Sequence, residues 1–143
     1  LSAVAKFLDN REGDTIDGET IYNAICFQTR VTMDDGKYLL LCGDSAYAML
    51  KSNLKNMSYI QLPHHGKYEI AEKIFEQKDK EFGLDVKYYV SDNTGTTNGG
   101  SDTLKKKSFG HSVTYTTAGD INVSAHVAAP KYVPGKSLGV IVR

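Results

Sequence analysis

Two short motifs in this chain carry the residue types of a reactive or metal-binding site. Asp44 follows Gly43 after one apolar run, and His64 and His65 follow Pro63 after a second apolar run. Open α/β sheets bind ligands beyond the carboxyl ends of their strands, which is where both motifs would lie. Carboxylate oxygens and imidazole nitrogens are both common ligands of metal ions in proteins. The motifs therefore predict a site that contains Asp44 and a histidine.

Each motif also has a plainer interpretation. An aspartate that precedes a helix is most often an N-cap, and both histidines would then be surface loop residues. Neighbours in an extended segment point to opposite faces, so only one of His64 and His65 is expected to enter the site, while the other packs or supports it. A nucleophilic pair of Cys42 with His64 is a further alternative. The apolar run around Cys42 favours a buried, inert thiol instead.

The segments around these motifs alternate between strand-like and helix-like patterns. Residues 34–36, Asp-Asp-Gly, mark a tight turn between two apolar runs, which predicts a β-hairpin. Ser45 is expected to cap a helix that starts directly after Asp44, and Gly83 to end the longest helix. In chain order the expected elements are a hairpin of 23–33 and 37–42, a helix at 45–54, a strand at 59–62, a helix at 69–82, a strand at 86–91, a helix at 102–109, a hairpin of 112–117 and 121–127, and an edge strand at 138–142.

This order predicts an α/β fold with a mixed sheet, helices on one face and antiparallel additions at its margins. A chain of 143 residues suits a single domain. Residues 1–22 form a poorly defined lead-in, and 128–143 form a tail or edge strand. The 17 basic and 17 acidic residues balance, so nucleic acid stays a conceivable partner that the charge does not support. No segment is long and apolar enough for a membrane span.

Together the motifs resemble the second half of the metallo-β-lactamase superfamily. The closest likeness is to the branch that includes the hydrolase domain of bacterial competence (DNA-internalisation) proteins. The likeness covers residues 23–127 and implies a fold equivalent to the second half of the αββα sandwich of that family. It is carried by Asn23-Ala24-Ile25, Leu40-Leu41-Cys42-Gly43-Asp44, Leu62-Pro63-His64-His65-Gly66, Val90-Ser91, and Tyr115-Thr116 followed by Gly119-Asp120-Ile121.

The resemblance implies a metal-dependent hydrolase with Asp44 and His64 as its catalytic candidates. Asp44 would be a metal ligand able to bridge two ions, and His64 would complete the shell of one ion, with His65 as the substitute ligand. The expected metal is Zn²⁺, with Mn²⁺ or Fe as alternatives. Two such ions about 4 Å apart clamp a substrate oxygen and activate a water molecule. The implied substrate is a phosphodiester or a related ester.

The chain also departs from this family. The His-x-His-x-Asp-His element that supplies most of the family's ligands does not occur, and His111 and His126 do not fit its spacing. Asn98-Gly99-Gly100-Ser101 stands where relatives often carry Gly-His-Pro. We therefore expect the C-terminal portion of a longer bacterial protein, cytoplasmic or extracytoplasmic, with its metal site empty or partly filled and little activity alone. The alternative is a non-catalytic interaction or assembly module derived from the fold.

The half-domain interpretation has a physical consequence for partners. The full fold packs two sheets face to face, so one half alone would expose the apolar face of its sheet. Soluble monomers rarely leave apolar patches larger than a few hundred Å² uncovered. We therefore expect the chain to bind the missing N-terminal half of the same protein, or to self-associate through this face.

Overall fold

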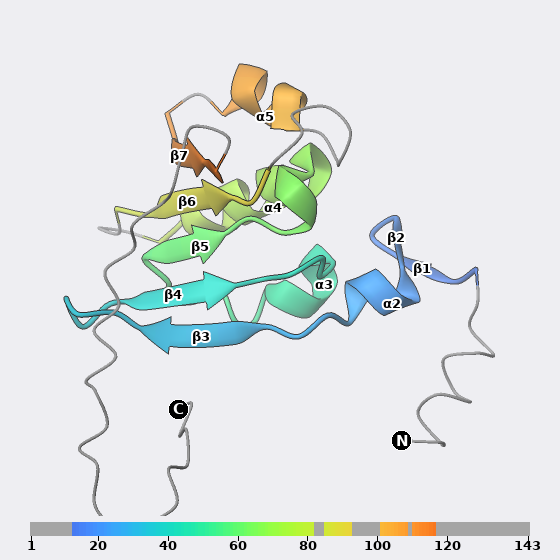
Figure 1. The fold of residues 1–143 in the computed structure, drawn as a ribbon, viewed down its shortest axis with the longest axis horizontal. Coiled ribbons are helices and arrows are strands. Elements are labelled where there is room, and N and C mark those ends of the chain that lie inside the picture. The colour runs from blue at the N-terminus through green and yellow to red at the C-terminus, as the bar shows by residue number, and fades with distance from the viewer. Residues whose placement is uncertain (1–12, 82–84, 93–100, 109, 117–143) are drawn as a thin grey trace, which may run out of the picture.

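A five-stranded mixed sheet forms the centre of the computed structural model, which describes residues 13–81, 85–92, 101–108 and 110–116 (Figure 1). The strand order is β3-β4-β5-β6-β7. Strands β3 and β4 are antiparallel, and every other pair of neighbours is parallel. The predicted α/β class with a mixed sheet is confirmed. The strands are β3 (Thr29–Thr32), β4 (Tyr38–Leu41), β5 (Tyr59–Gln61), β6 (Lys87–Val90) and β7 (Ser112–Tyr115).

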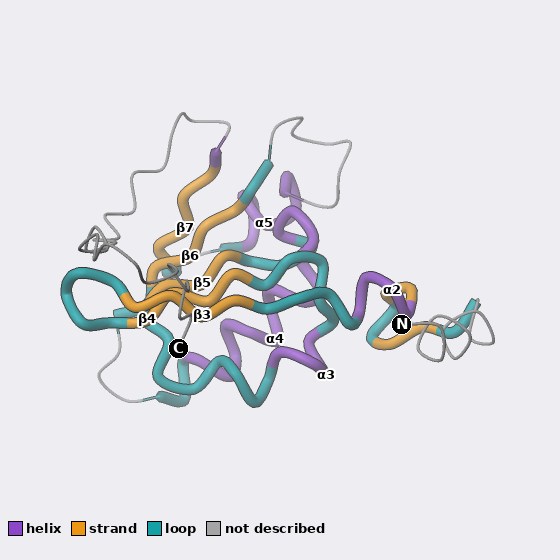
Figure 2. The backbone as a smooth tube through the Cα atoms, turned by 60° about the horizontal axis from the view of Figure 1, so that its bottom comes forward, coloured by secondary structure: helices purple, strands orange, loops and turns teal. Residues whose placement is uncertain are grey.

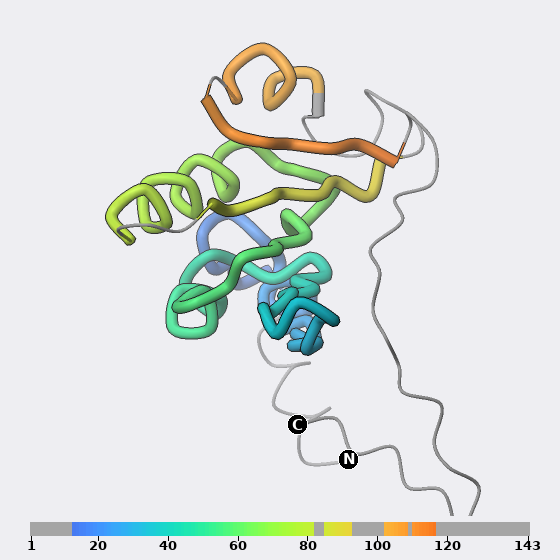
Figure 3. Tube along the Cα trace, turned by 90° about the vertical axis from the view of Figure 1, so that its left-hand side faces the viewer, coloured from blue at the N-terminus to red at the C-terminus, as the bar shows by residue number. Residues whose placement is uncertain are grey.

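Helices cover one face of this sheet, as Figures 2 and 3 show from two further directions. They are α3 (Tyr47–Leu50), α4 (Tyr68–Lys78) and α5 (Ser101–Lys107). The apolar sides of these helices pack against one row of strand residues and form a single buried cluster. Each large apolar side chain that is fully buried stabilises the fold by about 1.5–3 kcal/mol. The cluster includes Leu40, Ile60 and Tyr88 from the strands and Leu50, Ile70, Ile74, Phe75 and Leu104 from the helices.

The other face of the sheet carries an apolar and aromatic surface that no helix of the described residues covers. Successive strand residues point to opposite faces, so the neighbours of the core row lie here. Leu41 is 40% exposed, and the rings of Tyr59 and Tyr89 stack with centroids 6.4 Å apart. We call this surface, made of Val31, Leu41, Tyr59 and Tyr89 around the buried Leu39, the open face.

A short hairpin lies beside the sheet at the N-terminal side of the described chain. It consists of β1 (Thr15–Ile16) and β2 (Glu19–Thr20), which pair antiparallel, and it leads into α2 (Ile21–Ala24). Asp17 in its turn accepts hydrogen bonds from the Ala48 backbone N–H at 2.8 Å and from Lys73 Nζ at 3.0 Å. These contacts attach the hairpin to α3 and α4.

The expected strand at 23–33 is wrong in its first half. Helix α2 occupies its start, and β3 begins only at Thr29. The Thr20 hydroxyl accepts from the backbone N–H of Asn23 at 3.4 Å, which caps a helical turn. Phe27 is 98% exposed. The apolar alternation in this segment is therefore not a core-facing pattern.

The helix expected directly after Asp44 is also wrong in its start and length. The N-cap of α3 is Ala46, which makes no side-chain capping bond. The Ser45 hydroxyl donates instead to the carbonyl of Cys26 at 3.1 Å. Helix α3 ends at Leu50, and the buried Leu54 lies in the loop that follows.

The later elements match their predictions closely, with α4, β6, α5 and β7 near the expected bounds. The stop at Gly83, the Asn98-Gly99-Gly100 segment, the second strand of the closing hairpin at 121–127 and the tail at 128–143 lie outside the described residues. None of the helices within the described ranges has the length and apolar character that crossing a bilayer requires.

Candidate functional site

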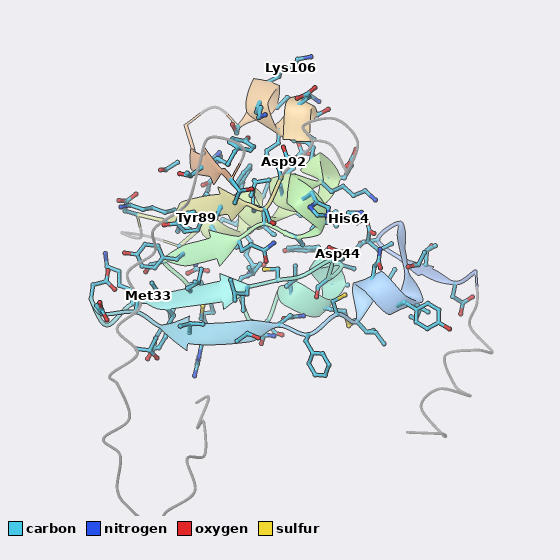
Figure 4. The ribbon with its side chains drawn as sticks, in the orientation of Figure 1. Met33, Asp44, His64, Tyr89, Asp92 and Lys106 are labelled. Atoms are coloured by element: carbon cyan, nitrogen blue, oxygen red, sulfur yellow. The ribbon has the colours of Figure 1, made fainter. Side chains whose placement is uncertain are left out.

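The structure brings Asp44 and His64 to the same edge of the sheet. Strands β4 and β5 are parallel, so the turns that follow them meet at one side. The backbone N–H of His64 donates to the carbonyl of Gly43 at 3.0 Å, which joins the two turns directly. Figure 4 shows Asp44 and His64 at this common end of the strands. The two motifs therefore lie next to each other, as expected from the sequence, and a backbone hydrogen bond joins them.

Gln61 fixes the turn that presents Asp44. Its side-chain oxygen accepts from the backbone N–H of Cys42 at 2.9 Å and from that of Gly43 at 3.3 Å. Gly43 has a φ of +55°, and a Cβ there would lie 3.3 Å from Cys26 Cβ. Glycine is thus favoured by the left-handed backbone conformation and by the limited space beside Cys26. The role of Gln61 was not predictable from the sequence, because its partners are backbone groups at the end of another strand.

His64 and His65 lie in a turn rather than on a strand. They form the 3₁₀ turn η1 (His64–Gly66), with φ values of +49° and +53°. Their ring centroids are 6.2 Å apart, with the planes 72° from parallel. The expected extended segment is therefore wrong, because the backbone at both histidines is left-handed, but the two rings still contact different segments of the chain.

A buried carboxylate holds the imidazole of His64. Glu19 from β2 has a side chain only 3% exposed, and its Oε2 lies 2.7 Å from His64 Nδ1. The other carboxylate oxygen of Glu19 is paired with Lys67 Nζ. Sequence reasoning missed Glu19, because it belongs to a two-residue strand without apolar periodicity and lies 45 positions from His64.

His65 is attached to a different strand. Its Nδ1 lies 2.7 Å from the carbonyl oxygen of Ser91, which follows β6. A carbonyl oxygen is only an acceptor, so Nδ1 carries the hydrogen in this contact. His65 therefore ties the η1 turn to the end of the third parallel strand, while His64 faces the β1–β2 hairpin.

Asp44 and His64 are the two groups that suit a metal ion or a reacting water at this edge. The partly exposed Asp44 carboxylate makes no hydrogen bond or ion pair within the described parts of the chain. His64 uses Nδ1 for Glu19, which leaves Nε2 as its remaining ring nitrogen. The donor types fit Zn²⁺ or Mn²⁺. Among the described residues, however, no group of three or more His, Cys, Asp or Glu side chains could hold an ion.

The alternative chemistries are less well supported. Cys42 is completely buried, and burial raises the pKa of its thiol to about 12. It is therefore an inert thiol rather than a nucleophile paired with His64. His111 lies elsewhere, with its ring stacked on Phe75 at 4.1 Å and its Nε2 3.1 Å from an oxygen of Asp79. His126 lies outside the described residues.

No family model, no curated protein and no solved structure matches the chain, so its function is inferred from the geometry of these residues.

Proposed function

We propose that the chain supplies part of the active site of a metal-dependent hydrolase of the metallo-β-lactamase superfamily, and corresponds to the C-terminal half of its αββα sandwich. The single observation that carries this proposal is the contact between the two motif turns, where the N–H of His64 donates to the carbonyl of Gly43. This contact joins the turn that carries the uncommitted carboxylate of Asp44 to the turn that carries His64, whose Nδ1 is already engaged. The proposed substrate is a phosphodiester or a related ester.

The residues of this chain have distinct roles in the proposed site. Asp44 and His64 would hold the metal, with His65 as the substitute ligand, and Gln61 fixes the turn of Asp44. A bound Zn²⁺ or Mn²⁺ would polarise the substrate oxygen and activate water. The remaining ligands would come from outside the described residues, so we expect little or no hydrolysis by this chain alone.

Metal retention tests the proposed ligands directly. The full chain is dialysed against Zn²⁺ or Mn²⁺ and then against metal-free buffer, and the metal retained is measured by mass spectrometry. Because this chain supplies only part of the ligand set, we expect partial retention by the unmodified chain and its loss in Asp44→Asn and His64→Gln. The control Asp85→Asn changes an exposed carboxylate away from this edge and should retain the metal. Equal retention by all variants would contradict the proposal.

The open face is where we propose that a partner packs. In the hydrolase interpretation this partner is the missing N-terminal half of the same protein, and in its absence a second copy of the chain. The exposed Leu41 and the stacked Tyr59 and Tyr89 favour a partner with an apolar sheet. The same surface supports the second candidate function, a non-catalytic assembly module in which Asp44 and His64 bind nothing.

The mass of the chain in solution tests the open face. Analytical ultracentrifugation should show self-association that Leu41→Lys weakens. Thr32→Lys on β3 places the same charge at an exposed position outside the open face and should leave association unchanged. A monomer that binds no hydrophobic dye would contradict the exposed interface. Association without any metal retention would favour the assembly module over the hydrolase.

A further inference from the structure

Glu19 is a buried charge whose two oxygens are both occupied. Its Oε2 lies 2.7 Å from His64 Nδ1, and its Oε1 is paired with Lys67 Nζ. The side chain is 3% exposed, whereas those of His64 and Lys67 are 26% and 29% exposed. Burying a carboxylate costs free energy unless it is paired and hydrogen-bonded. The imidazole of His64 and the ammonium group of Lys67 meet this requirement, and they fix the position of the Glu19 carboxylate.

The chemistry of this contact decides which nitrogen of His64 carries the hydrogen. An ionised carboxylate can only accept hydrogen bonds, so His64 Nδ1 must donate to Glu19. In a neutral imidazole the other nitrogen then has the lone pair. The lone pair of His64 is therefore on Nε2, which makes no hydrogen bond within the described part of the chain.

The hairpin that carries Glu19 is itself held in place. Asp17, two residues before Glu19, accepts from the Ala48 backbone and from Lys73. The carboxylate of Glu19 therefore approaches His64 from a segment anchored on two helices. A group that is fixed independently of its partner can orient that partner's ring.

We infer that Glu19 is a positioning residue that keeps His64 in the Nδ1–H tautomer and so reserves Nε2 for a ligand. The inference deepens the proposed function and rests on it where a metal is concerned. Carboxylates that orient a histidine in this way typically change metal affinity by about 10–100-fold when they are mutated. The tautomer itself is a property of the chain without any metal.

The variant Glu19→Gln should reverse the direction of the hydrogen bond with His64 Nδ1, while the side chain at position 19 keeps its size. Lys67 needs an acceptor, so the amide oxygen of the glutamine should turn to Lys67, and its NH₂ group should face His64 Nδ1. Nδ1 must then accept, and the hydrogen moves to Nε2. Lys67→Met removes the other partner of Glu19 and leaves the carboxylate facing His64, so the tautomer should be retained. Glu76→Gln changes an exposed glutamate of α4 and serves as the general control.

Long-range ¹H–¹⁵N NMR spectra of the full chain distinguish the two tautomers. The spectra are recorded at increasing pH until the imidazole signals stop changing, and backbone amide spectra verify that each variant is folded. We expect Nδ1–H for His64 in the unmodified chain, in Lys67→Met and in Glu76→Gln, and Nε2–H in folded Glu19→Gln. Nε2–H in the unmodified chain, or the same tautomer in Glu19→Gln, would overturn the inference.

A Zn²⁺ titration of the same samples separates the inference from the proposed function. If both hold, Glu19→Gln weakens Zn²⁺ binding by about 10–100-fold, and Glu76→Gln does not. If the tautomer changes as expected but no form of the chain binds Zn²⁺, Glu19 is a positioning residue and the proposed metal site is wrong. Should Zn²⁺ bind while the tautomer is unaffected by Glu19→Gln, the metal site stands and the role of Glu19 is refuted.

Discussion

Replacing Gly66 with alanine should destabilise the protein more than an ordinary glycine substitution. Gly66 has a φ of +76°, a conformation that costs a residue with a side chain about 1–2 kcal/mol. A Cβ at this position would also lie 2.9 Å from Leu104 Cδ2 and 3.1 Å from both methyl groups of Val90. Leu104 and Val90 are completely buried, so this crowding should add about 1–3 kcal/mol. Gly66→Ala should therefore cost about 2–5 kcal/mol in total.

Gly36 provides a matched control for this prediction. Its φ is also +76°, but no atom lies within 4 Å of the Cβ that alanine would add. Gly36→Ala should therefore cost only the backbone strain of about 1–2 kcal/mol. Urea unfolding followed by circular dichroism measures both losses, and the difference between them isolates the crowding. Equal losses would refute the argument that η1 is packed against α5 and β6.

Three further predictions concern ionisable groups. At about pH 8 the thiol of Cys42 should resist alkylation in the folded chain and react once it is unfolded, because burial raises its pKa to about 12. Tyr59→Phe should raise the pKa of Asp35 measured by NMR, since the hydrogen bond from the Tyr59 hydroxyl is the main cause of its lowered pKa. Lys73→Met should raise the lowered pKa of Asp17 and reduce stability at neutral pH more than in acid.

The sign of the last prediction follows from the direction of the shift. A carboxyl pKa that is lower in the folded state than in the unfolded state contributes stability above the unfolded value, and this contribution is lost as the pH falls. The hydrogen bond from Lys73 is the largest cause of the lowered pKa of Asp17. Thermal unfolding at neutral and acidic pH measures the effect. An equal loss at both values, an unchanged pKa of Asp35, or rapid alkylation of folded Cys42 would contradict the respective prediction.

The sequence predicted the part of the site that depends on parallel strands. Apolar runs ending in Gly43–Asp44 and Pro63–His64 indicated two strands, and the carboxyl ends of parallel neighbours must meet at one edge. The proximity of Asp44 and His64 follows from that rule. The conformation of His64 and His65 did not, because the apolar pattern of the strands carries no information about a left-handed backbone at two successive residues.

Glu19 shows what sequence patterns do not reveal. Its hairpin has strands of two residues each, too short for any alternation to be recognised. The polar composition around it is typical of a turn, and a buried glutamate is uncommon unless it is paired. Its partners His64 and Lys67 are more than forty positions away. Only the folded arrangement connects them. The misassigned helix start has a similar cause, because the Ser45 hydroxyl bonds to a distant carbonyl.

The two consecutive left-handed histidines combine an unfavourable backbone conformation with favourable side-chain contacts. Each left-handed residue with a side chain costs about 1–2 kcal/mol relative to a relaxed backbone, and glycine would relieve that cost at either position. The imidazoles offset part of this cost, because His64 is a partner of the buried Glu19 carboxylate and His65 bonds to the Ser91 carbonyl. A library of the chain selected only for heat tolerance should therefore accept glycine at 65 more readily than at 64. Under the proposed function, selection for metal binding should preserve the ring of His64.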